Sequence, residues 1–138
     1  ERGVKGALIN AGGDIRVYGP REDGEAWNIA LQNPRAPADN LFSFPLREGA
    51  VATSGDYRRY YDAQRKHHHI LDPRSGRSAT GLISVSVIAP TAMDADALAT
   101  GVFVLGPDAG LRLIESLAGA EAFLVTTERQ FLSSSGWR

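Results

Sequence analysis

Residues 81–105 read GLISVSVIAPTAMDADALATGVFVL, and the change of pattern inside this stretch decides the fold class. In its first half, Ile83, Val85 and Val87 alternate with serines up to Pro90. A period of two predicts a β-strand with one buried face and one polar face. Proline at the end of the run predicts that the strand stops there.

In the second half of the stretch the hydrophobic period lengthens. Leu98, Val102 and Leu105 are spaced as i, i+4 and i+7. This spacing predicts a helix over residues 93–105 with that stripe facing the core. Gly106-Pro107 should end it.

A second helix is expected directly afterwards. Asp108 is a suitable N-cap, and Gly119 a suitable end. Between them, one face of the helix would carry Leu111, Ile114, Leu117 and Ala118.

Short alternating segments dominate the rest of the chain. We expect strands at residues 7–9, 14–18, 27–32, 42–46, 49–53, 123–125 and 131–132. Strands and helices do not alternate regularly, so the sequence predicts an α+β fold with a mixed or mostly antiparallel sheet and two consecutive helices near the C-terminus. Residues 57–81 give no clear pattern.

Composition limits the class of protein. The 138 residues suit one domain, 1–138, and 43% hydrophobic residues exclude intrinsic disorder. Lys and Arg total 15 against 16 Asp and Glu, so we expect no nucleic acid partner. Without cysteine there is no disulfide, thiolate metal site or cysteine nucleophile. No apolar run approaches the roughly 20 residues of a membrane-spanning helix.

Segments that combine glycine with polar residues interrupt or end the predicted strands at two places. Asn10, Gly12, Gly13 and Asp14 suit either a plain hairpin turn or a backbone that a ligand approaches closely. The segment Thr53-Ser54-Gly55 suits either the capping of a strand end or the binding of an anion by hydroxyl and N–H groups.

All three histidines are adjacent, as His67, His68 and His69. Neighbouring side chains in an extended segment point to opposite sides, so at most two can share a metal. Exposed surface positions are an equally simple interpretation for His67 and His68. His69 precedes the turn 70–76, which could hold it as an acid/base group.

Asp96 and Thr100 lie four residues apart on the first predicted helix and therefore face the same side. A carboxylate and a hydroxyl are hard oxygen ligands of the kind that Mg²⁺ takes together with substrate phosphates. The simpler alternative is that the aspartate only favours the helix N-terminus.

Taken in order, five segments resemble the FAD:protein FMN transferases, the ApbE family, formerly called thiamine-biosynthesis lipoproteins. The segments are Asn10–Asp14, Trp27–Ile29, Ala52–Tyr57, His69–Gly76 and Asp96–Thr100. The resemblance runs from about residue 6 to the end and implies an ApbE-like, T-fold-like domain.

The resemblance implies an enzyme that binds FAD and Mg²⁺ and transfers FMN to a threonine hydroxyl of a target flavoprotein, releasing AMP. It implies Asp96 and Thr100 as metal ligands and His69 as a histidine that assists catalysis. It also implies two segments that line the flavin nucleotide pocket: Asn10, Gly12, Gly13 and Asp14, and Thr53, Ser54 and Gly55.

The resemblance covers only the C-terminal portion of the family. We expect the family's N-terminal half, with its lysine-glycine motif, to be absent from this chain. Alternatives are a non-catalytic FAD-binding domain and an FAD pyrophosphatase that yields FMN and AMP. The family further implies a bacterial periplasmic or envelope protein, lipid-anchored in its full-length form.

Overall fold

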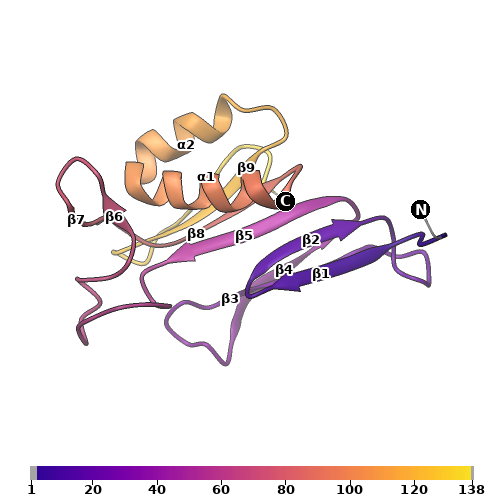
Figure 1. Cartoon of the computed structure of the whole chain (residues 1–138), viewed down its shortest axis with the longest axis horizontal. Helices are drawn as coiled ribbons and strands as arrows, with labels where there is room; N and C mark the ends of the chain where they lie inside the picture. The colour runs from indigo at the N-terminus through magenta and orange to yellow at the C-terminus, as the bar shows by residue number, and fades with distance from the viewer. Residues whose placement is uncertain (1–2, 138) are drawn as a thin grey trace.

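The centre of the fold is one antiparallel sheet of six strands (Figure 1). The computed structural model describes residues 3–137. In spatial order the strands are β1 (Ala7–Ala11), β2 (Asp14–Tyr18), β5 (Gly49–Gly55), β8 (Leu82–Ala89), β9 (Glu121–Thr126) and β10 (Phe131–Ser133). Every neighbouring pair is antiparallel, which confirms the α+β prediction.

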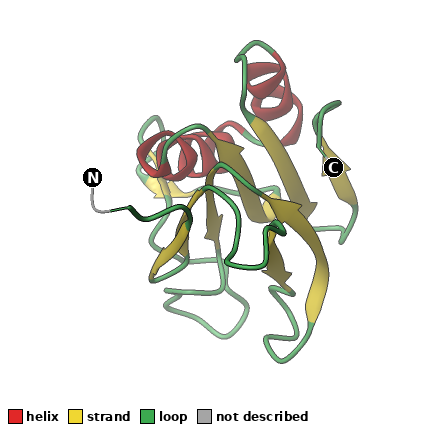
Figure 2. Cartoon of the chain, turned by 90° about the vertical axis from the view of Figure 1, so that its right-hand side faces the viewer, coloured by secondary structure: helices red, strands yellow, loops and turns green. Residues whose placement is uncertain are grey.

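The remaining strands form two hairpins outside this sheet. β3 (Trp27–Gln32) pairs with β4 (Asn40–Leu46), and β6 (Leu71–Asp72) pairs with β7 (Arg77–Ser78). The β3–β4 hairpin packs on one face of the large sheet through Ile29, Leu31 and Phe44. Both helices lie on the other face (Figure 2), so the molecule has three layers.

Strand β8 is buried on both faces, whereas the sequence predicted one polar face exposed to water. Val85 and Val87 pack under the helices. The serine face is covered by the β3–β4 side, where Ser86 is 4% exposed. Its hydroxyl lies 2.8 Å from that of Thr53, which satisfies both groups inside the core.

Helix α1 (Ala92–Leu105) starts one residue earlier than predicted. The Thr91 side chain caps it by accepting a hydrogen bond from the N–H of Asp94. The predicted core stripe is partly wrong, because Leu105 is 41% exposed. The helix instead packs on the sheet through the small residues Ala95 and Ala99, together with Val102 and Phe103.

Helix α2 (Pro107–Glu115) begins before the predicted cap. Gly106 is the N-cap with φ at 81°, Pro107 follows it, and Asp108 lies in the first turn, so its prediction as N-cap was wrong. Proline suits this position because the first helical N–H needs no partner. The helix ends four residues before Gly119, which leaves Leu117 and Ala118 outside it. No helix of the described residues is long and apolar enough to cross a membrane.

Candidate functional site

A cavity of about 600 Å³ opens between the β3–β4 hairpin and the large sheet. Its lining comes from the β1–β2 turn, β3, the centre of β5 and β8, and the segment after β5. The lining residues are Asn10, Gly12, Gly13, Asp14, Ile15, Ile29, Ala30, Leu31, Gln32, Val51, Thr53, Tyr57, Arg58, Arg59 and Ser86. All four residues predicted from the first glycine segment therefore border one cavity.

The β1–β2 turn is both a tight hairpin and a wall of this cavity. Gly12 and Gly13 have φ of 72° and 117°, a conformation that side chains disfavour. The Asn10 side chain fixes the turn by accepting a hydrogen bond from the N–H of Gly13 at 2.9 Å. The two interpretations of this segment are therefore compatible.

The second predicted segment is divided between the two faces of the sheet. Thr53 lines the cavity, whereas the Ser54 hydroxyl lies 2.8 Å from that of Thr100 on helix α1. Gly55 lies beneath the Tyr57 ring, where a Cβ would come within 2.3 Å of the ring. The glycine therefore lets Tyr57 fold back over the end of β5.

Asp14 and Asp96 lie close enough to influence each other. Partial burial, and then the negative charge of Asp96, raise the pKa of the Asp14 carboxyl. Thr100 lies on the same helix as Asp96, and its hydroxyl contacts that of Ser54 on β5 at 2.8 Å. The sheet and helix α1 thus bring together carboxylate and hydroxyl oxygens that the sequence separates by more than 80 residues.

Carboxylate and hydroxyl oxygens such as those of Asp96 and Thr100 are the hard ligands that a divalent cation such as Mg²⁺ takes. Among residues 3–137 no three His, Asp or Glu side chains are grouped to hold a metal by themselves. A cation bound by Asp96 and Thr100 would therefore take its further ligands from water or from the phosphates of a bound molecule.

The three histidines have three separate environments. The His67 ring lies 2.8 Å from the Asp62 carboxylate at the surface. His68 is only 3% exposed, so the surface interpretation is wrong for it, and its Nε2 lies 3.0 Å from the Ala79 carbonyl oxygen. The exposed His69 places Nδ1 3.1 Å from the Arg59 carbonyl oxygen. Arg59 lines the cavity, so His69 is anchored next to its wall.

Sequence reasoning missed Tyr57, Arg58 and Arg59 as cavity residues. Arg58 extends over the Tyr57 ring, 5.9 Å from its centre, and one of its nitrogens lies 3.8 Å from where a Cβ of Gly13 would be. Burial raises the pKa of the Tyr57 phenol, so it remains a hydrogen-bond donor. The available signal was their position directly after Ala52–Asp56, which places them at the same strand end.

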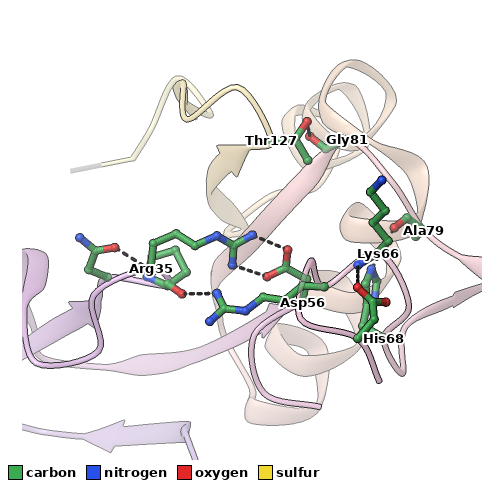
Figure 3. Close-up of polar contacts among 11 residues, drawn as sticks. Arg35, Asp56, Lys66, His68, Ala79, Gly81 and Thr127 are labelled. Atoms are coloured by element: carbon green, nitrogen blue, oxygen red, sulfur yellow. Dashed lines mark hydrogen bonds and ion pairs between the residues drawn. The ribbon is translucent and has the colours of Figure 1, made fainter. Parts of the chain in front are cut away.

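An ion pair also missed by sequence reasoning links the β3–β4 loop to the residue that follows β5 (Figure 3). Arg35, in the loop between β3 and β4, binds Asp56 at the end of β5 through two parallel hydrogen bonds of 2.7 and 2.6 Å. The Asp56 side chain is 7% exposed. Such a two-pronged pair fixes orientation as well as distance. It therefore holds the β3–β4 hairpin against the segment that carries Tyr57 and Arg58.

Comparison with known proteins gives one consistent result. The ApbE family model matches residues 1–124. The FAD:protein FMN transferase of Haemophilus influenzae is 35% identical over 132 residues, covering 93% of this chain and 38% of its own length. A protein of the same name from Klebsiella pneumoniae is 38% identical, covering 98% of this chain and 42% of its own length.

Solved structures agree in fold. The ApbE protein of Thermotoga maritima has a TM-score of 0.84 and 37% identity, over 94% of this chain and 43% of its own. The apo flavinyl transferase ApbE of Pseudomonas stutzeri has a TM-score of 0.78 and 36% identity, over 96% and 42%. This chain thus spans about two fifths of the length of the relatives it matches. With the family model covering most of its residues, the chain belongs to the ApbE family.

Proposed function

We propose that this chain is the C-terminal portion of a Mg²⁺-dependent FAD:protein FMN transferase, which moves FMN from FAD to a threonine hydroxyl of a target flavoprotein and releases AMP. Its relatives carry the name FAD:protein FMN transferase. The observation that carries the proposal is that Asn10, Gly12, Gly13 and Asp14 border one cavity. Asp14 also lies near enough to Asp96 on helix α1 for the two charges to interact.

This proximity joins a nucleotide-sized cavity to a candidate cation site. A volume of about 600 Å³ lies in the usual range for small-molecule sites. Arg58 and Arg59 supply positive charge to the cavity lining, where phosphate oxygens of FAD would be favoured. The hydroxyls of Thr53 and Ser86 and the amide of Gln32 offer hydrogen bonds to the polar parts of a flavin nucleotide.

Asp96 and Thr100 would hold the Mg²⁺ from one side of helix α1, with Ser54 supporting the Thr100 hydroxyl at 2.8 Å. When bound, Mg²⁺ offsets the charge that develops on pyrophosphate oxygens during phosphoryl transfer. The protein groups keep the carboxylate and hydroxyl oxygens in place before the substrate arrives, which avoids reorganisation during the reaction.

The environment of His69 suits a general base. A carbonyl oxygen can only accept a hydrogen bond, so the neutral ring presents its Nδ1–H to the Arg59 carbonyl. Nε2 is then left with a free lone pair, and the exposed side chain can reach an incoming threonine hydroxyl. We propose that His69 accepts the proton of that hydroxyl.

We further propose that turnover requires the part of the family that this chain does not cover, because its relatives are more than twice as long. A location in the bacterial envelope, with a lipid anchor in the full-length form, belongs to the same proposal. Fractionation of cells that produce the full-length protein tests the location.

The experiment incubates the protein with FAD, Mg²⁺ and a target flavoprotein, and records covalent flavin fluorescence together with AMP release. Flavin bound to the target with equal AMP supports the transferase. AMP without protein-bound flavin indicates a pyrophosphatase, and FAD binding without AMP indicates a non-catalytic binding domain. The same assay is run with the family's N-terminal half supplied as a separate chain.

Two pairs of variants test the assigned residues. Asp96→Ala should abolish the Mg²⁺-dependent reaction, whereas Asp108→Ala, an exposed carboxylate in the first turn of α2, should not. His69→Asn should slow transfer more than it weakens FAD binding, with the exposed His67→Asn as control. Full activity of Asp96→Ala, or a His69→Asn effect confined to FAD binding, contradicts the assigned roles.

A further inference from the structure

A second cavity, of about 520 Å³, lies around the end of β5 and the start of β8, and we propose that it binds a small phosphate-bearing anion. Figure 3 shows part of its lining. The lining residues are Arg35, Asp56, Gln64, Arg65, Lys66, His68, Ala79, Thr80, Gly81, Leu82, Ile83, Thr127 and Arg129. Among the described residues none lines both cavities, so the two sites are lined by separate sets of residues.

The charge of this cavity is strongly unbalanced. Four side chains of its lining are cationic, and a single carboxylate, Asp56, opposes them. Both carboxylate oxygens of Asp56 already accept hydrogen bonds from the Arg35 guanidinium. This leaves Arg65, Lys66 and Arg129, and within residues 3–137 no salt bridge includes any of these three.

Two nearby carboxylates, Asp62 and Glu128, lie outside the lining and form hydrogen bonds of their own. Asp62 accepts hydrogen bonds from the N–H groups of Lys66 and His67 and lies against the His67 ring. Glu128 accepts a hydrogen bond from the Thr127 hydroxyl at 3.0 Å. The Arg65 guanidinium donates one hydrogen bond, to the Pro34 carbonyl oxygen at 3.4 Å. Among residues 3–137 no carboxylate pairs with Arg65, Lys66 or Arg129, so their charge is available to an anion.

The backbone presents two of these cations in an unusual conformation. Arg65 and Arg129 have φ of 59° and 64°, and in the described chain they are the two non-glycine residues with positive φ. This region disfavours side chains other than Asn and Asp, and such conformations concentrate at functional sites. Both arginines close tight turns, through N–H bonds to the carbonyls of Asp62 and Thr126.

The cavity floor is fixed and partly apolar. Buried Leu82 and Ile83 contribute to it, and His68 has both ring nitrogens engaged by the backbone, to Ala79 and Ile70. The Arg65 guanidinium lies 5.1 Å from the centre of the Tyr60 ring, which limits its motion. Planar guanidinium groups around a rigid floor match the geometry of phosphate oxygens. A compact phosphate-bearing molecule therefore fits this cavity better than an extended polymer chain does.

Titration calorimetry of the chain with inorganic phosphate, pyrophosphate and AMP tests the proposal. Arg65→Asn and Arg129→Asn remove a charge while keeping a residue that tolerates positive φ. Each should weaken binding roughly 10- to 100-fold, because a charged hydrogen bond is lost. Arg112→Gln removes an exposed charge from α2, remote from the cavity lining, and should bind like the parent.

The choice of ligands separates two sources of the phosphate group. Equal affinity for phosphate and AMP identifies the phosphate group alone as the ligand, whereas tighter AMP binding identifies a nucleotide monophosphate. Either result supports the site if the two asparagine variants lose affinity. The proposal is overturned if nothing saturates below about 10 mM, or if Arg65→Asn and Arg129→Asn bind as tightly as Arg112→Gln.

Discussion

Breaking the ion pair between Arg35 and Asp56 should destabilise the fold more than any surface charge change. Asp56→Asn keeps the shape of the side chain but leaves the Arg35 guanidinium without its counter-charge. Removing one partner of a buried pair costs about 3–5 kcal/mol. Because the Arg35 side chain is 29% exposed and regains some water, we expect about 2–4 kcal/mol. For a chain of this size that lowers Tm by roughly 6–12 °C.

The assay is urea unfolding at equilibrium, with an unchanged slope required before the midpoints are compared. Asp23→Asn is the matched control, since the Arg21–Asp23 pair is about half exposed on both sides and should change stability by less than about 0.5 kcal/mol. The double variant Arg35→Met with Asp56→Asn should recover part of the loss, because the uncompensated charge is gone. Equal midpoints for Asp56→Asn and Asp23→Asn would refute this reasoning.

Three further predictions concern the core and the Tyr57 phenol. Gly110→Ala should destabilise the protein by about 1–3 kcal/mol, because the new Cβ would lie 2.6 Å from Val102 Cγ1 between the helices. The control Gly101→Ala meets nothing within 4 Å and should stabilise the protein by up to about 1 kcal/mol, so a loss of stability in this variant contradicts the reasoning. Truncating the fully buried Phe103 to Ala should cost about 3–5 kcal/mol in urea unfolding. Burial raises the pKa of Tyr57 above its usual 10.0, so the unfolded chain loses this proton first and stability should fall as pH rises past that value. Tyr57→Phe should make this decline shallower in unfolding curves recorded on either side of that pH.

The period of the hydrophobic pattern was sufficient to predict both helices and the strands outside residues 57–81, but not β6, β7 or which residues make contact. Leu105 fits the helical stripe by spacing and is nevertheless exposed, because α1 faces the sheet with Ala95 and Ala99. Small residues permit close approach of a helix to a sheet, and a pattern that counts only large apolar residues overlooks them. The buried serines of β8 show the opposite error, because polar residues there lie inside the protein. Ser86 is covered by the β3–β4 hairpin, which lies about 50 residues earlier in the sequence.

The same limit applies to the candidate site, where local motifs could be predicted and contacts between distant segments could not. Local motifs predicted the glycine turn and the pair Asp96 and Thr100, since each rests on neighbours in sequence. The Arg35–Asp56 pair could not be predicted from local pattern, because its partners are 21 residues apart and meet only when the hairpin closes on the sheet. His68 and His69 are adjacent, and only the packing of Phe103 against the His68 ring distinguishes the buried one.

Strand order explains why the proposed cation ligands and the cavity lie in one region. β5 lies between β2 and β8, and α1 follows β8 and crosses back over β5. Asp14 begins β2, Ser54 lies near the end of antiparallel β5, and so both fall at the same end of the sheet. Helix α1 adds Asp96 and Thr100 above that end, while Thr53 faces the cavity below it. Because Thr53 and Ser54 point to opposite faces, residues next to each other in the chain contribute to the cavity on one side and contact the proposed cation ligand Thr100 on the other.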